Sequence, residues 1–110
     1  MKKIAFFDID GTLTSEIDGS IPESAVYAIR AARANGNLMF INTGRCFQNV
    51  EQRFRDVGFD GFVCGCGTFI SYHGETLLAD EIPMPLADAI YEDLHKYRLE
   101  WLLEGQHAIY

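Results

Sequence analysis

An apolar run at residues 4–7 leads directly into two aspartates one residue apart, in the sequence D-I-D-G-T-L-T of residues 8–14. Side chains two residues apart on an extended chain point the same way, so the carboxylates of Asp8 and Asp10 would repel each other at the end of a strand. A hard cation such as Mg²⁺ relieves that repulsion and also gathers phosphate oxygens. The pattern therefore predicts a buried strand that ends in a site for phosphoryl transfer. The alternative is an ordinary Asp-Gly hairpin turn, which leaves Asp8 and Thr12 unexplained.

The composition of the 110 residues is that of one ordinary folded domain, with 48% hydrophobic and 23% charged residues. Nine basic and sixteen acidic residues give a net charge of -7, which argues against binding to nucleic acid or to an anionic membrane surface. An anionic substrate would then need local positive charge, which a metal ion supplies. No apolar run approaches the roughly 20 residues of a membrane span, and the apolar run before Asp8 is too short for a signal peptide. We expect a cytoplasmic protein.

The three cysteines are expected to be reduced thiols. Cys46, Cys64 and Cys66 make an odd number and show no disulfide framework spacing. A metal site built from Cys64, Cys66 and His73 is the alternative, but four-ligand zinc sites usually show two paired clusters. The three histidines of the chain show no metal spacing either, and we interpret them as turn or surface residues.

The order of apolar and polar segments predicts a β-α-β-α-β unit. Strands are expected at residues 4–7, 38–41 and 62–64, and helices at residues 22–35 and 46–57. Such an order calls for right-handed crossovers and a doubly wound parallel α/β sheet. Ligands of these sheets bind beyond the carboxyl ends of the strands, which is where Asp8, Asp10 and Thr43 fall. On the first helix, Arg30 and Arg33 are expected to face water.

The rhythm changes after the third strand. Two short strands are expected at residues 68–72 and 76–79, around a hairpin turn at His73 and Gly74. The prolines of residues 82–85 then indicate a stiff linker. A third helix follows over residues 86–94, and two more strands are expected at residues 100–104 and 107–110. This second part reads as the start of another α/β unit.

The sequences F-F-D-I-D-G-T-L-T and I-N-T-G-R resemble the first two motifs of the haloacid dehalogenase superfamily of phosphatases, and their separation fits that family. The hairpin and proline linker that follow are similar to the Cof-type subfamily, in which a large α/β cap is inserted after the second motif. The resemblance implies a Rossmannoid core of the haloacid dehalogenase type over residues 1–82. It also implies that residues 83–110 begin the inserted cap.

The resemblance implies a role for each residue of the two motifs. Asp8 would be the nucleophile that forms an aspartyl-phosphate, and Asp10 the general acid that then becomes the base for water. The carboxylate of Asp8 and the backbone carbonyl of Asp10 would bind Mg²⁺. Thr43 and the amide of Gly44 would hold phosphate oxygens, although Thr43 could instead be the N-cap of a helix. Arg45 would either reach the substrate phosphate in bidentate fashion or be a solvated side chain.

The implied function is that of a Mg²⁺-dependent phosphatase for a small phosphorylated metabolite, such as a sugar phosphate or a nucleotide-like monoester. The family also uses a later lysine and a Gly-Asp-x-x-x-Asp motif, but the only lysine after Thr43 is Lys96, and no such motif follows. Cys66 and Gly67 also depart from the Asn-Gly that the subfamily often has there. We therefore expect an amino-terminal portion of a longer protein, inactive by itself, with the remainder of the fold in that longer chain.

Two other functions stay open at this point. A phosphoacceptor signalling module also combines a parallel sheet, paired acids and a Thr at strand ends, and its phospho-aspartate would persist and switch a partner surface. A non-catalytic relative would bind phosphate or a protein partner without turnover. The Asp-x-Asp-Gly-Thr order favours the phosphatase over the signalling module.

Overall fold

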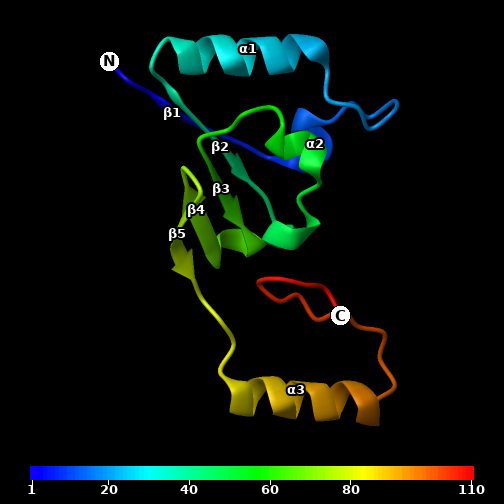
Figure 1. The fold of residues 1–110 in the computed structure, drawn as a ribbon. Coiled ribbons are helices and arrows are strands. Elements are labelled where there is room, and N and C mark those ends of the chain that lie inside the picture. The colour runs from blue at the N-terminus through cyan, green and yellow to red at the C-terminus, as the bar shows by residue number, and fades with distance from the viewer.

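The computed structural model describes residues 1–110 and contains a five-stranded sheet (Figure 1). The strands are β1 (Ile4–Phe7), β2 (Leu38–Asn42), β3 (Gly61–Cys64), β4 (Phe69–Tyr72) and β5 (Glu75–Ala79), and they lie side by side in this order. The first three are parallel, whereas β4 and β5 are each antiparallel to the strand before. The helices are α1 (Glu23–Ala34), α2 (Gln52–Arg55) and α3 (Met84–Lys96). The expected α/β Rossmann-like core is confirmed.

The hydrophobic core lies on one face of the sheet, between the strands and the helices α1 and α2. Its buried residues come from both helices, from β2 and β3 and from the connecting loops. Side chains alternate along β1, so Ala5 and Phe7 pack against this core while Ile4 and Phe6 point to the opposite face. Phe6 remains 57% exposed there. The strands lie in sequence order, and right-handed crossovers between them place the connecting helices on the same side of the sheet. The helices therefore cover one face of the sheet.

Aromatic rings form a row across the opposite face. The ring of Phe40 lies 5.4 Å from that of Phe6 and stacks on Tyr72 at 5.8 Å. Gly61 stands between Phe40 and Tyr72 in the pairing of β2, β3 and β4, and it has no side chain to separate the two rings. A Cβ at this position would clash with the Phe40 ring and with the carbonyl oxygen of Ser71. The missing side chain therefore lets β2 contact β4 across β3.

The prediction of one helix over residues 46–57 is wrong. The structure has a 3₁₀ turn at Phe47–Asn49 and, after a break, the single-turn helix α2. The guanidinium of Arg55 donates to the carbonyl oxygens of Phe47 at 2.8 Å and Val50 at 3.0 Å. In a continuous helix these carbonyls would accept hydrogen bonds from backbone N–H groups four residues later. Here the Arg55 side chain donates to them instead.

Arg30 is exposed, as expected, whereas Arg33 is only partly exposed, and both arginines also bond to the chain. Arg30 donates to the carbonyl oxygens of Asp56 at 3.0 Å and Val57 at 3.1 Å. These carbonyls follow the end of α2, where a helix leaves acceptors without backbone partners. Arg33 donates two hydrogen bonds to Asp60, at 2.7 and 3.0 Å. Both arginines therefore attach α1 to the segment that joins α2 to β3.

The carboxylate of Asp60 ties three elements together. Asp60 lies directly before β3, and its side chain is 5% exposed. Besides the two hydrogen bonds from Arg33 on α1, it accepts one from the Met39 N–H of β2, at 2.8 Å. Burial by itself raises the pKa of this carboxyl, but the hydrogen bonds from Arg33 and Met39 outweigh burial and leave the pKa below its usual value. Asp60 is therefore a buried anion that stabilises the fold while it is charged.

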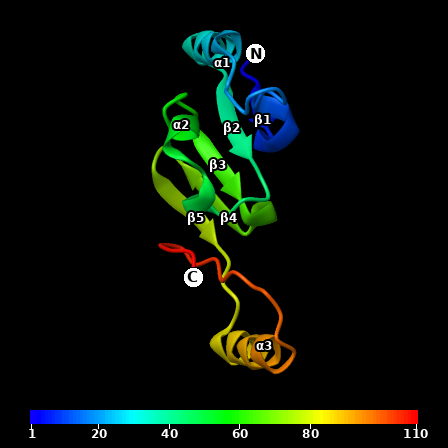
Figure 2. The same ribbon diagram turned by 90° about the vertical axis from the view of Figure 1, so that its right-hand side faces the viewer.

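The hairpin of β4 and β5 turns at His73 and Gly74, as expected. Their φ angles are +48° and +83°, the left-handed conformations that a two-residue hairpin turn requires. α3 begins at Met84, earlier than expected, with Pro85 in its first turn, where the missing N–H costs no helical bond. Figure 2 shows α3 set apart from the sheet, beyond the extended segment that follows β5. The division into a core and the start of a cap at residue 82 stays a prediction.

The two strands expected at residues 100–104 and 107–110 are reduced to a single antiparallel bridge between Glu104 and Ile109. Around it, Leu103 and Tyr110 exchange two backbone hydrogen bonds of 2.9 Å. This segment therefore forms a hairpin turn, but its two arms are too short to be strands. None of the helices has the length and apolar character that crossing a membrane would demand.

Substitution Gly61→Ala is expected to lower the free energy of unfolding by about 2 to 3 kcal/mol, because the added methyl group overlaps a ring and a backbone carbonyl. Urea denaturation of the full-length protein measures this. Gly44→Ala is the matched control, since a Cβ there meets only Cys66 Sγ, at 3.6 Å. Equal stability of the two variants would contradict the proposed close approach of β2 and β4.

Substitution Asp60→Asn is expected to destabilise the protein by roughly 3 kcal/mol at neutral pH, because the partner charge of Arg33 is left without its anion. The pKa of Asp60 is lowered in the folded state, so its contribution is present above the unfolded-state pKa and is lost as the pH falls through the folded-state pKa. The stability difference between wild type and variant should therefore shrink in acid. Urea curves at several pH values test this, with the exposed Asp56→Asn as control; a difference that is independent of pH would refute it.

Candidate active site

The carboxyl ends of the three parallel strands meet at one edge of the sheet. Asp8 follows β1, Thr43 follows β2 and Gly65 follows β3, and each is the first residue after its strand. The pairing of Phe7 with Ile41 brings the ends of β1 and β2 level with each other. The two motifs found in the sequence are therefore neighbours in space, as expected.

The chain turns sharply after Asp8, and buried residues fix this turn. Ile9 and Leu13 both belong to the hydrophobic core, and the N–H and hydroxyl of Thr14 donate to the Ile9 carbonyl at 3.2 and 3.1 Å. Between these anchors, Asp10 and Gly11 are exposed, and Gly11 adopts a φ of +76° that glycine accepts without strain. The turn therefore presents the polar residues of the first motif outward at the sheet edge.

The two aspartates have different surroundings. The carboxylate of Asp8 is exposed and accepts no hydrogen bond from the chain, whereas that of Asp10 accepts two from Arg45, at 2.6 and 2.9 Å. The Arg45 hydrogen bonds hold the pKa of Asp10 below its usual value, and the same contact raises the pKa of Arg45. Because the Asp10 side chain is 63% exposed, this bidentate ion pair is open to solvent and to exchange with another anion.

Arg45 lies at the centre of a small polar network. Its third nitrogen is 3.3 Å from Glu51 and 3.4 Å from the carbonyl oxygen of Asn49, and its guanidinium stands 5.6 Å from the Phe54 ring. Arg45 is therefore not a freely solvated side chain, because it binds Asp10, and its expected contact with a substrate phosphate stays a prediction. Sequence reasoning missed Glu51, because no spacing rule links it to residues 10 and 45. The only signal for Glu51 in the sequence was an acidic residue six positions after Arg45.

Thr43 shapes the turn after β2. It is 3% exposed, and its hydroxyl accepts the N–H of Arg45 at 3.2 Å. The helix N-cap expected as an alternative is not formed, because no helix begins before Phe47. The N–H of Gly44 is exposed and has no acceptor within the chain, so it is available to an incoming oxygen. A hydroxyl and a free amide thus stand together at the end of β2.

The loop after β3 forms the third wall of the site. The N–H of Gly65 donates to the Arg45 carbonyl at 2.8 Å, and that of Cys66 donates to the Thr43 carbonyl at 3.4 Å. Cys66 Sγ lies 3.6 Å from the point where a Cβ on Gly44 would be. The departure from Asn-Gly noted in the sequence therefore places a thiol directly beside the second motif. Cys64, in contrast, is buried, and burial raises its pKa to about 11.

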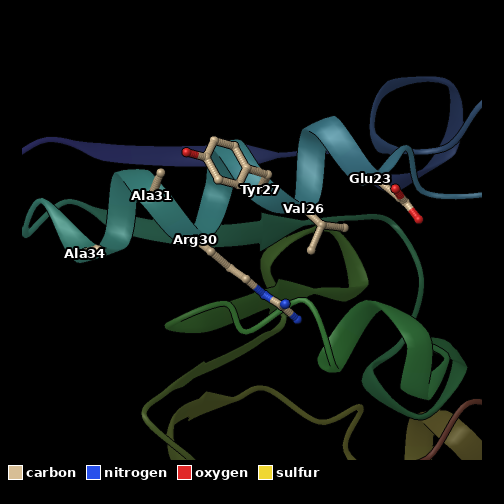
Figure 3. Close-up of a pocket in the computed structure, with 6 residues that line it drawn as sticks. All are labelled: Glu23, Val26, Tyr27, Arg30, Ala31 and Ala34. Atoms are coloured by element: carbon tan, nitrogen blue, oxygen red, sulfur yellow. The ribbon is translucent and has the colours of Figure 1, made fainter.

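A hollow of the surface lies elsewhere. It has a volume of about 540 Å³ and runs along α1, where it is lined by Glu23, Val26, Tyr27, Arg30, Ala31 and Ala34 (Figure 3). It contains none of the residues from the two motifs. The candidate active site is instead an open edge of the sheet.

The chain belongs to the haloacid dehalogenase-like hydrolase family, whose model matches residues 5–110. The strand-end position of the two motifs agrees with this membership.

Individual relatives agree with this assignment. The chain is similar to "Putative phosphatase YkrA" of Bacillus subtilis (strain 168), with 27% identity over 97% of this chain and 38% of the relative. Among solved structures, a hypothetical protein of Geobacillus kaustophilus HTA426 matches with a TM-score of 0.89 and 29% identity, over 99% of this chain and 42% of that one. The sugar phosphatase BT4131, of haloacid dehalogenase subclass IIB, matches with a TM-score of 0.76 and 31% identity, over 99% and 43%. The chain thus spans about two fifths of the length of these relatives.

Substitution Arg45→Gln is expected to raise the pKa of Asp10 toward its ordinary value, because both hydrogen bonds and the positive charge are lost. Carboxyl ¹³C NMR titration in metal-free buffer measures that pKa directly. Arg53→Gln is the matched control, since Arg53 contacts Glu51 but not Asp10. An unchanged Asp10 pKa in Arg45→Gln would show that the ion pair is absent in solution.

Proposed function

We propose that the complete protein is a Mg²⁺-dependent phosphatase that hydrolyses a small phosphate monoester through an aspartyl-phosphate on Asp8. The observation that carries the proposal is the free Asp8 carboxylate at the end of β1, beside the hydroxyl of Thr43 and the free N–H of Gly44 at the end of β2. A nucleophile next to donors for phosphate oxygens is what phosphoryl transfer needs. A solved relative with 30% identity is described as belonging to a phosphoryl-transfer superfamily, which supports the same chemistry.

The oxygen donors at the strand ends fit a magnesium ion. Mg²⁺ commonly uses one or two carboxylates and keeps several waters, and the free Asp8 carboxylate provides the first. The Asp10 carboxylate is occupied by Arg45, so the backbone carbonyl of Asp10 is the better second donor. No cluster of three acidic, histidine or cysteine side chains stands here, so further ligands would come from elsewhere in the longer chain. When bound, the ion would neutralise charge shared by the phosphate and the nucleophile.

The reaction would proceed in two balanced steps. An Asp8 carboxylate oxygen attacks phosphorus, the bond to the ester oxygen breaks, and Asp10 gives its proton to the leaving alkoxide. Water then attacks the phosphorus of the aspartyl-phosphate while Asp10 takes its proton, which releases phosphate and restores both carboxyl groups. Asp8 is unpaired and can attack directly, whereas Asp10 must first leave its hydrogen bonds with Arg45 before it can carry a proton.

Arg45 would change partners during this cycle. As long as Arg45 binds Asp10, its hydrogen bonds lower the pKa of that carboxyl and disfavour the protonated form that an acid needs. A phosphate dianion offers the guanidinium the same bidentate geometry with more charge. An entering substrate would therefore draw Arg45 away and leave Asp10 free to carry a proton. Thr43 and Gly44 would position the remaining phosphate oxygens.

The substrate class proposed is a small phosphorylated metabolite, a sugar phosphate or nucleotide-like monoester. The relative BT4131 is a sugar phosphatase by name, which supports the first of these. The open sheet edge needs a cover to exclude water, and the α3 region is proposed to begin a cap that supplies part of it. The net charge of -7 makes nucleic acid an unsuitable partner. A cytoplasmic location is part of the same proposal.

Substitution Asp8→Asn in the full-length protein is expected to lower Mg²⁺-dependent hydrolysis of an aryl phosphate by roughly a thousandfold or more, because an amide cannot replace the nucleophile. Release of the coloured phenol measures the rate. Asp88→Asn, on an exposed part of α3, is the control and should keep full activity. Undiminished activity in Asp8→Asn would remove Asp8 from the mechanism.

The lifetime of the phospho-aspartate separates the phosphatase from the signalling alternative. In a phosphatase the phospho-aspartate should turn over within seconds, whereas in a phosphoacceptor module it should last for minutes or longer. Labelling with a small acyl phosphate, followed by a timed quench, gives this lifetime. A long-lived phospho-aspartate on Asp8 would favour the signalling function over the hydrolase.

A further inference from the structure

A carboxylate that the proposed reaction does not use stands beside Arg45. Glu51 lies directly before α2, and one of its oxygens is 3.3 Å from a terminal nitrogen of Arg45. The Nε and the other terminal nitrogen of Arg45 bind Asp10, at 2.9 and 2.6 Å. The guanidinium therefore has two carboxylate partners, which come from turns that are far apart in the sequence.

Glu51 is itself fixed by a second arginine. Its two oxygens accept hydrogen bonds from Arg53, at 2.7 and 3.2 Å. Arg53 also donates to the Gly19 carbonyl at 2.6 Å, in the loop that follows the first motif. Hydrogen bonds from Arg53, and then from Arg45, hold the pKa of Glu51 below its usual value, so this side chain is an anion at neutral pH. Arg45 thus meets a carboxylate whose place is determined by other contacts.

The ring of Phe54 supports both guanidinium groups. Phe54 is fully buried, and the guanidinium of Arg45 lies 5.6 Å from its ring centre and that of Arg53 lies 4.6 Å from it. An aromatic face attracts a cation and leaves the N–H groups free for hydrogen bonds. The side chain of Arg45 is only 23% exposed, whereas that of its partner Asp10 is 63% exposed. Arg45 is therefore the better fixed member of this ion pair.

The proposed exchange of partners concerns only some of the donors of Arg45. A phosphate dianion would compete with Asp10 for the two nitrogens of the bidentate contact. The nitrogen that faces Glu51 takes no part in that contact and can keep its partner. A guanidinium that is already held by one contact loses less freedom when it binds an anion with its other donors. By its charge alone, however, Glu51 would repel a phosphate.

We propose that Glu51 is a positioning residue, which holds Arg45 so that the donors now on Asp10 can pass to a substrate phosphate. The inference rests on the proposed phosphatase function and assigns Glu51 no contact with the substrate. Positioning and charge predict opposite effects when the charge of Glu51 is removed. Loss of positioning weakens phosphate binding, whereas loss of a repelling charge strengthens it, so the sign of the change separates the two.

The test measures the dissociation constant of inorganic phosphate for the full-length protein with Mg²⁺, by isothermal titration calorimetry. Glu51→Gln should weaken binding by roughly two- to fivefold, the worth of one exposed ion pair. With an aryl phosphate, KM should rise by a similar factor while kcat changes less. Asp56→Asn is the matched control, because it removes the same charge from the same segment and its carboxylate bonds to Gln52 and not to Arg45. Its phosphate affinity should be unchanged or slightly higher.

Two further measurements test whether Glu51 acts through Arg45. In the Arg45→Gln background, the additional change Glu51→Gln should not weaken phosphate binding any further. In buffer without metal or phosphate, the Arg45 Nε–H signal in ¹⁵N NMR should exchange with water faster in Glu51→Gln than in the wild type, because the guanidinium is less firmly held. This second readout does not depend on catalysis.

Unchanged or tighter phosphate binding in Glu51→Gln would overturn the inference and leave the proposed function intact. An unchanged Arg45 signal would do the same. A further loss of affinity in the double variant would show that Glu51 acts by a route other than Arg45, which also overturns the inference. A wild type that binds no phosphate would overturn the proposed function, and the inference with it.

Discussion

The parallel alignment of β1, β2 and β3 is the constraint on which the rest of the structure depends. It brings three strand ends to one edge, and so joins residues that are far apart in the chain. The contact between Asp10 and Arg45 exists only because of this alignment. Burial of one sheet face fixes the alignment, because a shift by one residue would turn the side chains of β2 away from the core. The same hydrophobic pattern thus determines both the fold and the candidate active site.

The sequence was sufficient for the elements whose signals are local. The apolar strands, the hairpin turn at His73 and Gly74 and the end of α1 follow from patterns within a few residues, and all were predicted. The two motifs also led to the fold, because the family that they resemble is the one whose model matches residues 5–110.

What could not be predicted depends on arginine side chains that reach across the molecule. Arg55 interrupts an expected helix, and Arg33 bonds to Asp60 instead of water. Arginine is amphipathic and long, so its sequence position does not reveal which carbonyl or carboxylate it will contact. In the candidate site, the residue types were predictable, but the pairing of Asp10 with Arg45 was not, because it depends on how two turns face each other.

Two bidentate arginine–aspartate pairs thus occupy opposite ends of the same sheet, and they differ in their access to water. The pair of Arg33 and Asp60 is largely enclosed, whereas that of Arg45 and Asp10 is open. Dissolved salt screens exposed charges far more than enclosed ones. A rise in ionic strength should therefore loosen the contact between Arg45 and Asp10 at the rim of the candidate site, while the contact between Arg33 and Asp60 in the scaffold stays intact.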